Sequence, residues 1–223
     1  MKNSLFAQAL AKFTAGLLLV GALIFLPAWT PDYWQGWLLM GVLFIPMFGA
    51  GLVMLAKSPA LLKKRLQAKE EQGEQKAVIA LSGLMFLAAF LVAGLSRRFG
   101  WYLLPGWVSW TAAAAFLIAY ALYAEVLREN AYLSRTIEVQ EGQQVVDTGL
   151  YGIVRHPMYA VTVLLFLAMP LVLGSPVSFV IMLCYPAILV RRIRNEEEVL
   201  ARGLPGYTDY QKKVKFRLLP GIW

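Results

Sequence analysis

Two short segments in the C-terminal half of the chain hold most of its clustered polar side chains. The first, residues 147–159, reads DTGLYGIVRHPMY and places Arg155 beside the one histidine of the chain. The second, residues 191–200, reads RRIRNEEEVL, in which Arg192 precedes Glu196 by four positions, so that both lie on one helix face. If the fold brings the two segments together, their opposite charges form a pocket for a zwitterionic ligand.

The backbone of the first segment also favours a ligand site. Gly149 and Gly152 permit a close, turning backbone, and Pro157 suits the first turn of the helix that follows. Free N–H groups at that helix start, next to Arg155 and His156, are expected to hold a carboxylate or phosphate. The plainer interpretation is that these basic side chains only mark a membrane interface, and that the second segment is a solvated helix end with weak ion pairs.

Common catalytic motifs are absent from the sequence. It contains no GxGxxG, GxxxxGK[ST], GxSxG or HExxH pattern, which excludes a Rossmann fingerprint, a P-loop, a hydrolase elbow and a zincin site. With a single His and a single Cys, we expect no metal site. Cys184 lies in an apolar run, so we expect a buried, unreactive thiol.

The composition places the chain in a membrane. Of its 223 residues, 59% are hydrophobic and only 15% are charged, and the mean hydropathy is +0.60. Soluble domains usually have about 25% charged residues. A disordered chain, a basic nucleic-acid-binding domain and an ordinary cytosolic enzyme are therefore disfavoured, and no nucleic-acid partner is expected. The partner of the apolar surface is the lipid bilayer.

Six apolar runs predict an all-α fold, a polytopic transmembrane helical bundle. A spanning helix needs roughly 20 mostly apolar residues, because lipid offers the backbone no hydrogen-bond partners. The first run is expected to be a retained helix rather than a cleaved signal peptide, since it is long and lacks a convincing cleavage site. Four runs reach the required length: 10–29, 36–56, 77–96 and 105–127.

The last two runs, 158–173 and 176–190, are shorter and predict a tight helical hairpin around the sequence GSP. A hairpin returns the chain to the membrane face it left, so it brings the two polar segments together. We expect a single membrane domain over residues 1–223. Within it, residues 1–127 form a scaffold of four helices, and residues 128–223 carry the hairpin 158–190, the motifs and the tail.

Charge distribution predicts the topology. Of the 21 Lys and Arg residues, only Arg97 and Arg98 fall on the outer side, so the remaining 19 would be cytoplasmic. This asymmetry predicts that both termini are cytoplasmic. The inner segment after Ser58 reads PALLKKRL and is expected to form a basic amphipathic helix on the membrane surface. Six tryptophans flank the outer loops as expected interfacial anchors: Trp29, Trp34, Trp37, Trp101, Trp107 and Trp110.

The motifs resemble those of the isoprenylcysteine carboxyl methyltransferase family and the related phospholipid methyltransferases. The likeness covers residues 149–221 and includes the predicted hairpin. Residues 130–134, NAYLS, also look like the segment that precedes the motif in these proteins. The matching stretches, in order, are GLYGIVRHPMY from 149, RIRNEEEVL from 192, YTDYQKKV from 207 and RLLPG from 217.

The resemblance implies an integral membrane methyltransferase that uses S-adenosylmethionine, held in a cytoplasmic pocket under a C-terminal lid. A lipophilic or small acceptor would reach the pocket from the bilayer. We expect a monomer, and the short, minimal chain favours a bacterial inner membrane. Residues 204–210 form a tail one residue shorter than in the family, which alters the lid. The implied cofactor-binding residues are Gly149, Tyr151, Arg155, His156, Tyr159 and Glu197, and the implied catalytic residues are Arg192, Glu196 and Glu197.

The acceptor and the reaction class have alternatives. A carboxylate acceptor needs only Arg192 or a neighbour to orient it, whereas an amine or thiol needs a base, such as a glutamate with a raised pKa. Membrane sterol reductases, which use NADPH, have a similar RHPxY element and a similar tail, but the Glu196–Glu197 pair resembles the methyltransferases more closely. A non-catalytic scaffold or transporter is disfavoured because the charges gather at one interface.

Overall fold

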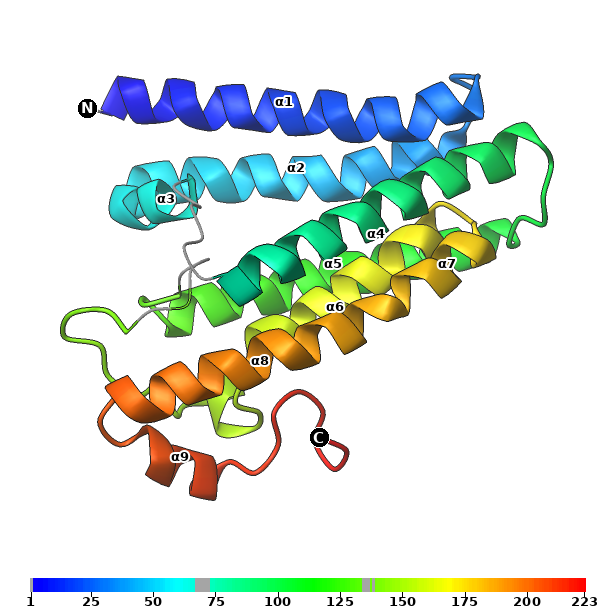
Figure 1. The fold of residues 1–223 in the computed structure, drawn as a ribbon. Coiled ribbons are helices and arrows are strands. Elements are labelled where there is room, and N and C mark those ends of the chain that lie inside the picture. Colours follow the sequence, from blue (N-terminus) through cyan, green and yellow to red (C-terminus); the bar gives the residue numbers. More distant parts are fainter. Residues whose placement is uncertain (1, 67–72, 134–136, 138) are drawn as a thin grey trace.

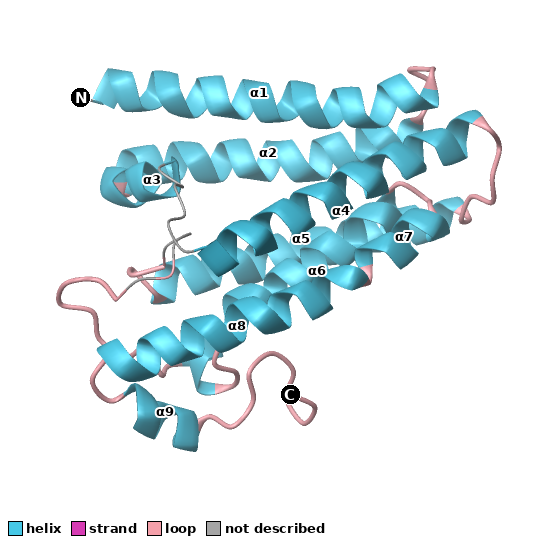
Figure 2. Ribbon diagram, viewed as in Figure 1, coloured by secondary structure: helices cyan, strands magenta, loops and turns pink. Residues whose placement is uncertain are grey.

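A computed structural model describes residues 2–66, 73–133, 137 and 139–223, and these residues form helices and loops with no strand (Figures 1 and 2). The all-α prediction is confirmed. In chain order the elements are α1 (Lys2–Ala28), α2 (Trp34–Lys57), α3 (Pro59–Leu66), α4 (Gly73–Arg98), α5 (Gly106–Glu129), the 3₁₀ helix η1 (Gly149–Gly152), α6 (Pro157–Val172), α7 (Pro176–Met182), α8 (Cys184–Gly203) and α9 (Tyr207–Lys213).

The long helices make this an integral membrane protein. Within the described residues, five helical stretches are long and apolar enough to cross a bilayer, namely α1, α2, α4, α5 and the combined stretch Pro176–Gly203. A sixth apolar helix, α6, has 16 residues. The four long runs and the hairpin expected from the sequence are therefore present. The segment after Ser58 forms the predicted short helix, α3.

The returning arm of the hairpin differs from its prediction. Instead of one helix that ends near residue 190, α7 stops at Met182 and α8 continues to Gly203. Pro186 explains the interruption, because it has no N–H to donate to the Met182 carbonyl and its ring crowds that group. The second arm therefore carries the polar segment 191–200 on the same helix as its apolar part.

The turn of the hairpin is hydrogen-bonded to the α1–α2 loop and to the α4–α5 loop. The buried Tyr33 hydroxyl, from the loop between α1 and α2, donates to the Leu173 carbonyl at 2.7 Å. From the loop between α4 and α5, the Leu104 N–H donates to the Gly174 carbonyl at 2.8 Å. Gly174 has a φ of +70°, which only glycine adopts readily. These loops and the turn lie at one end of the bundle, away from both termini (Figure 1).

The core lies between the hairpin and the helices that flank it. Helix α5 packs along α6, and α4 packs against α1, α7 and α8. Fully buried side chains include Leu39, Phe116, Met182 and Ile193. The expectation for Cys184 is wrong, because its side chain is exposed. Its neighbour Tyr185 turns into the core, and one step along a helix rotates by about 100°, which directs Cys184 outward.

Close contact between α1 and α4 depends on a small residue. A Cβ added at Gly94 of α4 would lie 2.6 Å from the Ile24 carbonyl oxygen and 2.9 Å from Pro27 of α1. Small residues allow this approach of two membrane helices.

We expect Gly94→Ala to force the two helices apart and to destabilise the protein by about 1–3 kcal/mol. Gly83→Ala is the matched control, because a Cβ there meets nothing within 4 Å on the same helix. Thermal unfolding in detergent, followed by tryptophan fluorescence, should give a lower Tm for the first variant and no loss for the second. Equal Tm values for the two variants would contradict the close packing.

Candidate active site

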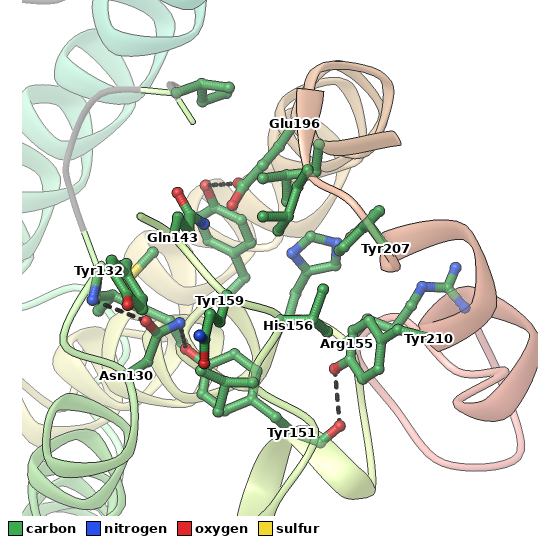
Figure 3. Close-up of a pocket in the computed structure, with 18 residues that line it drawn as sticks. Asn130, Tyr132, Gln143, Tyr151, Arg155, His156, Tyr159, Glu196, Tyr207 and Tyr210 are labelled. Carbon is green, nitrogen blue, oxygen red and sulfur yellow. Dashed lines mark hydrogen bonds between the residues drawn. The ribbon is translucent and has the colours of Figure 1, made fainter. Parts of the chain in front are cut away.

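A cavity of about 90 Å³ opens where the ends of α5, α6, α8 and α9 meet (Figure 3). Both polar segments contribute to it, so the predicted convergence of the two segments is present in the structure. Its polar lining combines one carboxylate with cationic, amide and phenolic groups: Asn130, Tyr132, Gln143, Gln144, Tyr151, Arg155, His156, Tyr159, Glu196, Tyr207 and Tyr210.

Behind the cavity, Glu197 is the centre of a buried ionic cluster. Arg155 and Arg217 each donate from Nε to one of its carboxylate oxygens at 2.7 Å. The His156 Nε2 atom lies 3.3 Å from the oxygen that Arg155 contacts. Glu197 is 5% exposed and Arg155 8%. Two charge-assisted hydrogen bonds stabilise the ionised carboxylate, so Glu197 is poorly suited to act as the proton acceptor that an amine substrate requires.

The C-terminal segment is bound to the start of α6 by its backbone. Arg155 and His156 donate their N–H groups to the carbonyls of Phe216 and Arg217, each at 2.9 Å. The Arg155 side chain also donates to the carbonyls of Val214 and Lys215. The two N–H groups that immediately precede α6 are therefore paired within the chain rather than free for a ligand. Local sequence could not reveal this, because the partner carbonyls belong to an irregular segment about 60 positions away.

A tyrosine links the predicted Arg192 and Glu196 pair. Arg192 Nε donates to the Tyr159 hydroxyl at 2.8 Å, and this hydroxyl donates to Glu196 Oε2 at 2.5 Å. Arg192 and Glu196 lie on α8, whereas Tyr159 comes from α6 and is buried. The arrangement fixes the Glu196 carboxylate at the cavity wall (Figure 3).

Helix α9 closes the cavity on the side of the tail. The Tyr210 hydroxyl donates to the Tyr151 carbonyl at 2.8 Å, and Asn130 donates to the Tyr151 hydroxyl at 3.0 Å (Figure 3). At the end of α9, Lys213 donates to Asp147 and thereby lowers the pKa of that carboxyl. The tail thus forms one wall of the cavity, as the lid prediction requires.

The tyrosines of this wall remain neutral. Burial raises the pKa of Tyr151, Tyr207 and Tyr210 well above the usual value, because the charged phenolate would be poorly solvated there. Tyr207 has a buried hydroxyl without a hydrogen-bond partner among the described residues. Such a group in a cavity wall can accept or donate a hydrogen bond to a ligand.

The structure places the predicted site residues at three locations relative to the cavity. Five of them line the cavity: Tyr151, Arg155, His156, Tyr159 and Glu196. Arg192 and Glu197 stand behind it and hold lining residues in place. Gly149 is exposed in the turn of η1 with a φ of +50°, and a Cβ there would overlap the Glu129 carboxylate. Its structural contribution is this turn.

Sequence reasoning about individual residues missed part of the site. The tail stretches that resemble the family contain Tyr207, Tyr210 and Arg217. Their place in these stretches was the sequence feature that could have identified them as site residues. Asn130 lies in the stretch 130–134 that also resembles the family, and this likeness was the available signal. Gln143 lies in a loop without periodicity, so no pattern marks it as a lining residue. The contact of Arg217 with Glu197 could not be predicted from local sequence, because only the folded tail brings the two side chains together.

Several known proteins are similar to this chain. A delta(14)-sterol reductase of Mus musculus is 31% identical over 91 residues, which are 40% of this chain and 22% of the reductase. The delta(14)-sterol reductase of Methylotuvimicrobium alcaliphilum is 26% identical over 93 residues and covers the same shares. This chain thus matches only about a fifth of each reductase. YpbQ of Bacillus subtilis, described as uncharacterized, is 25% identical over 165 residues, 74% of this chain and 95% of YpbQ.

Among solved structures, the eukaryotic intramembrane Ras methyltransferase ICMT, an isoprenylcysteine carboxyl methyltransferase, has a TM-score of 0.49 and 18% identity. The match covers 97% of this chain and 86% of the other. The sequence model of the isoprenylcysteine carboxyl methyltransferase family matches residues 106–202, which run from α5 through the hairpin to the end of α8 and include both polar segments. Over residues 106–202, the chain is therefore similar to the isoprenylcysteine carboxyl methyltransferase family.

Proposed function

We propose that the protein transfers a methyl group from S-adenosylmethionine to a lipophilic or small acceptor at the cytoplasmic face of a bacterial inner membrane. The observation that carries the proposal is the cavity at the hairpin, within the stretch that the family model matches. The Glu196 carboxylate lines this cavity together with Arg155 and His156. A methyl donor of this kind carries an α-amino group, a carboxylate and a sulfonium, so it needs both signs of charge close together.

The residues of the cavity fit this donor chemically. Glu196 would bind the positively charged part, and His156 with Arg155 would attract the carboxylate. The phenol rings of Tyr207 and Tyr210 offer faces for an adenine, and the unpartnered Tyr207 hydroxyl offers it a hydrogen bond. Ligand pockets usually enclose about 300–1,000 Å³, whereas this cavity is about 90 Å³. Donor binding is therefore expected to widen the cavity, with α9 moving outward.

The chemistry asks little of the protein beyond position and electrostatics. When bound, S-adenosylmethionine supplies a methyl group that is already activated by its sulfonium. The chain would hold donor and acceptor in line and exclude water, which can supply several kcal/mol of the rate acceleration. In this proposal Arg192 positions Tyr159, and Tyr159 positions Glu196. Glu197 holds the side chains of Arg155, His156 and Arg217 in place. The acceptor is a lipophilic or small carboxylate, amine or thiol.

The alternative activity is an NADPH-dependent reduction of the sterol reductase type, which the partial similarity to two delta(14)-sterol reductases favours. The Glu196 carboxylate at the cavity wall favours a cofactor with an amino group over one with several phosphates. A cofactor-binding measurement therefore discriminates between the two activities.

Calorimetric titration of the detergent-solubilised protein is expected to give saturable binding of S-adenosylhomocysteine and none of NADPH. The physical reason is the carboxylate at the cavity wall, which attracts an amino acid moiety and repels the phosphates of NADPH. Transfer of radiolabelled methyl groups into separate pools of lipid, small-thiol and prenylcysteine acceptors would then identify the acceptor. Binding of NADPH without binding of S-adenosylhomocysteine would replace the proposal with the reductase.

A further inference from the structure

Residues of α1, α2 and α3 line a second hollow. These three helices come together at the end of the bundle where the N-terminus lies (Figure 1). It has a volume of about 590 Å³ and shares no lining residue with the cavity described above. Most of its wall is apolar, with Phe13 of α1 and Met47 and Leu52 of α2 among the lining side chains. An apolar groove of this size on a membrane protein accommodates an acyl chain.

Glycine keeps this groove open. Gly16 of α1 and Gly51 of α2 both line it. A Cβ built at Gly51 meets nothing within 4 Å, and one built at Gly16 only reaches the edge of Phe44 at 3.9 Å. A larger residue at Gly51 would project into empty space inside the groove. The hollow is therefore a consequence of residue size along α1 and α2.

Two basic side chains lie in the wall of the otherwise apolar groove. Lys12 of α1 and Arg65 of α3 both line it, and Lys12 Nζ donates to the Leu66 carbonyl at the end of α3. The Arg65 guanidinium lies 5.7 Å from the centre of the Tyr123 ring. Its Nη2 atom is buried and has no hydrogen-bond partner among the described residues. A buried guanidinium without an acceptor is costly, and an anionic group in the groove that Arg65 lines would compensate its charge.

We propose that this groove binds an anionic phospholipid of the surrounding bilayer, with an acyl chain along the apolar wall and the headgroup phosphate at Arg65 and Lys12. The charges match, because two cations face the groove and none of its lining residues is acidic. The position also matches, since α3 is the basic helix predicted to lie at the cytoplasmic surface, where anionic headgroups concentrate. The groove has no lining residue in common with the cavity proposed for methyl transfer.

Native mass spectrometry of the purified full chain tests the headgroup. The protein is incubated with equal amounts of phosphatidylglycerol and phosphatidylcholine that carry identical acyl chains. We expect phosphatidylglycerol to be retained about fivefold or more over phosphatidylcholine, and Arg65→Gln to reduce this preference by about fivefold. Lys63→Gln is the matched control, because Lys63 lies on the same helix with the same charge but is exposed and does not line the groove.

A second pair of variants tests the acyl chain. Gly51→Leu is expected to lower retention of phosphatidylglycerol, because the new side chain fills the groove without changing its charge. Gly49→Leu should leave retention unchanged, since Gly49 also faces open space but does not line the groove. Equal retention of the two lipids by the unmodified protein, or an undiminished preference in Arg65→Gln, would overturn the proposal. Two further results would also overturn it. One is a dimer of the unmodified protein that is lost in Gly51→Leu but not in Gly49→Leu. The other is a Gly51→Leu variant that loses methyl transfer but still retains phosphatidylglycerol.

Discussion

Glu197→Gln is expected to abolish methyl transfer and to release the C-terminal segment, while the membrane helices stay folded. The substitution keeps the size of the side chain but removes the charge that two guanidinium groups, Arg155 and Arg217, share. Removal of one partner from a buried ion pair costs about 3–5 kcal/mol, because the remaining charge stays buried without compensation. Arg155 is also the residue that binds the backbone of the tail, so its displacement opens the cavity wall.

Two measurements separate the structural and the catalytic part of this result. Trypsin cleavage at Lys213 and Lys215 reports release of the tail, and radiolabelled methyl transfer reports activity. Glu198→Gln is the control, because its partner Arg202 lies at 3.6 Å and both side chains are exposed, a kind of pair worth about 0–1 kcal/mol. Unchanged proteolysis and full activity in Glu197→Gln would remove the ionic cluster from both roles. If the proposed methyl transfer were wrong, faster proteolysis of Glu197→Gln would still confirm that the ionic cluster binds the tail.

Tyr159→Phe is expected to lower kcat/KM by about 10- to 100-fold without loss of the fold. The variant loses one hydroxyl and with it both hydrogen bonds that join Arg192 to Glu196. A hydrogen bond to a charged group contributes about 1.5–3 kcal/mol, and 1.36 kcal/mol in an activation barrier is tenfold in rate. Loss of the one bond that positions Glu196 therefore corresponds to about 10- to 100-fold. Glu196 would then no longer be held at the cavity wall.

Steady-state methyl transfer with varied donor concentration checks this expectation, since a displaced Glu196 should raise KM for the donor more than it lowers kcat. Tyr120→Phe is the control, because its hydroxyl donates to the Leu43 carbonyl between α5 and α2 and does not line the cavity. If the two variants had equal kinetics, Tyr159 would be a packing residue only.

The sequence predicted the helices because long apolar runs leave the backbone no alternative in lipid. It also predicted the hairpin from the GSP turn, and from the hairpin the meeting of Arg155 and His156 with Glu196 and Glu197. The break at Leu183 had a visible cause in Pro186, but the continuous apolar pattern across it masked the interruption.

The contacts of the tail could not be predicted in the same way. Arg217 reaches Glu197, and the Phe216 carbonyl binds the Arg155 N–H, only because an irregular segment folds back over α6. Irregular segments carry no periodicity that would indicate which of their backbone groups are paired. The exposure of Cys184 was missed for a related reason, since burial within an apolar membrane helix depends on which side faces lipid rather than on hydrophobicity.

The hydrogen bonds between the hairpin turn and the α1–α2 and α4–α5 loops have a consequence for the surrounding bilayer. Because Leu173 and Gly174 are bonded to those loops, α6 traverses the full depth of the bundle with 16 residues, about 24 Å of helix. The hydrocarbon core of a typical bilayer is about 30 Å thick. The first arm of the hairpin is thus shorter than a usual spanning helix, and we expect lipid that contacts it to compress or tilt to match.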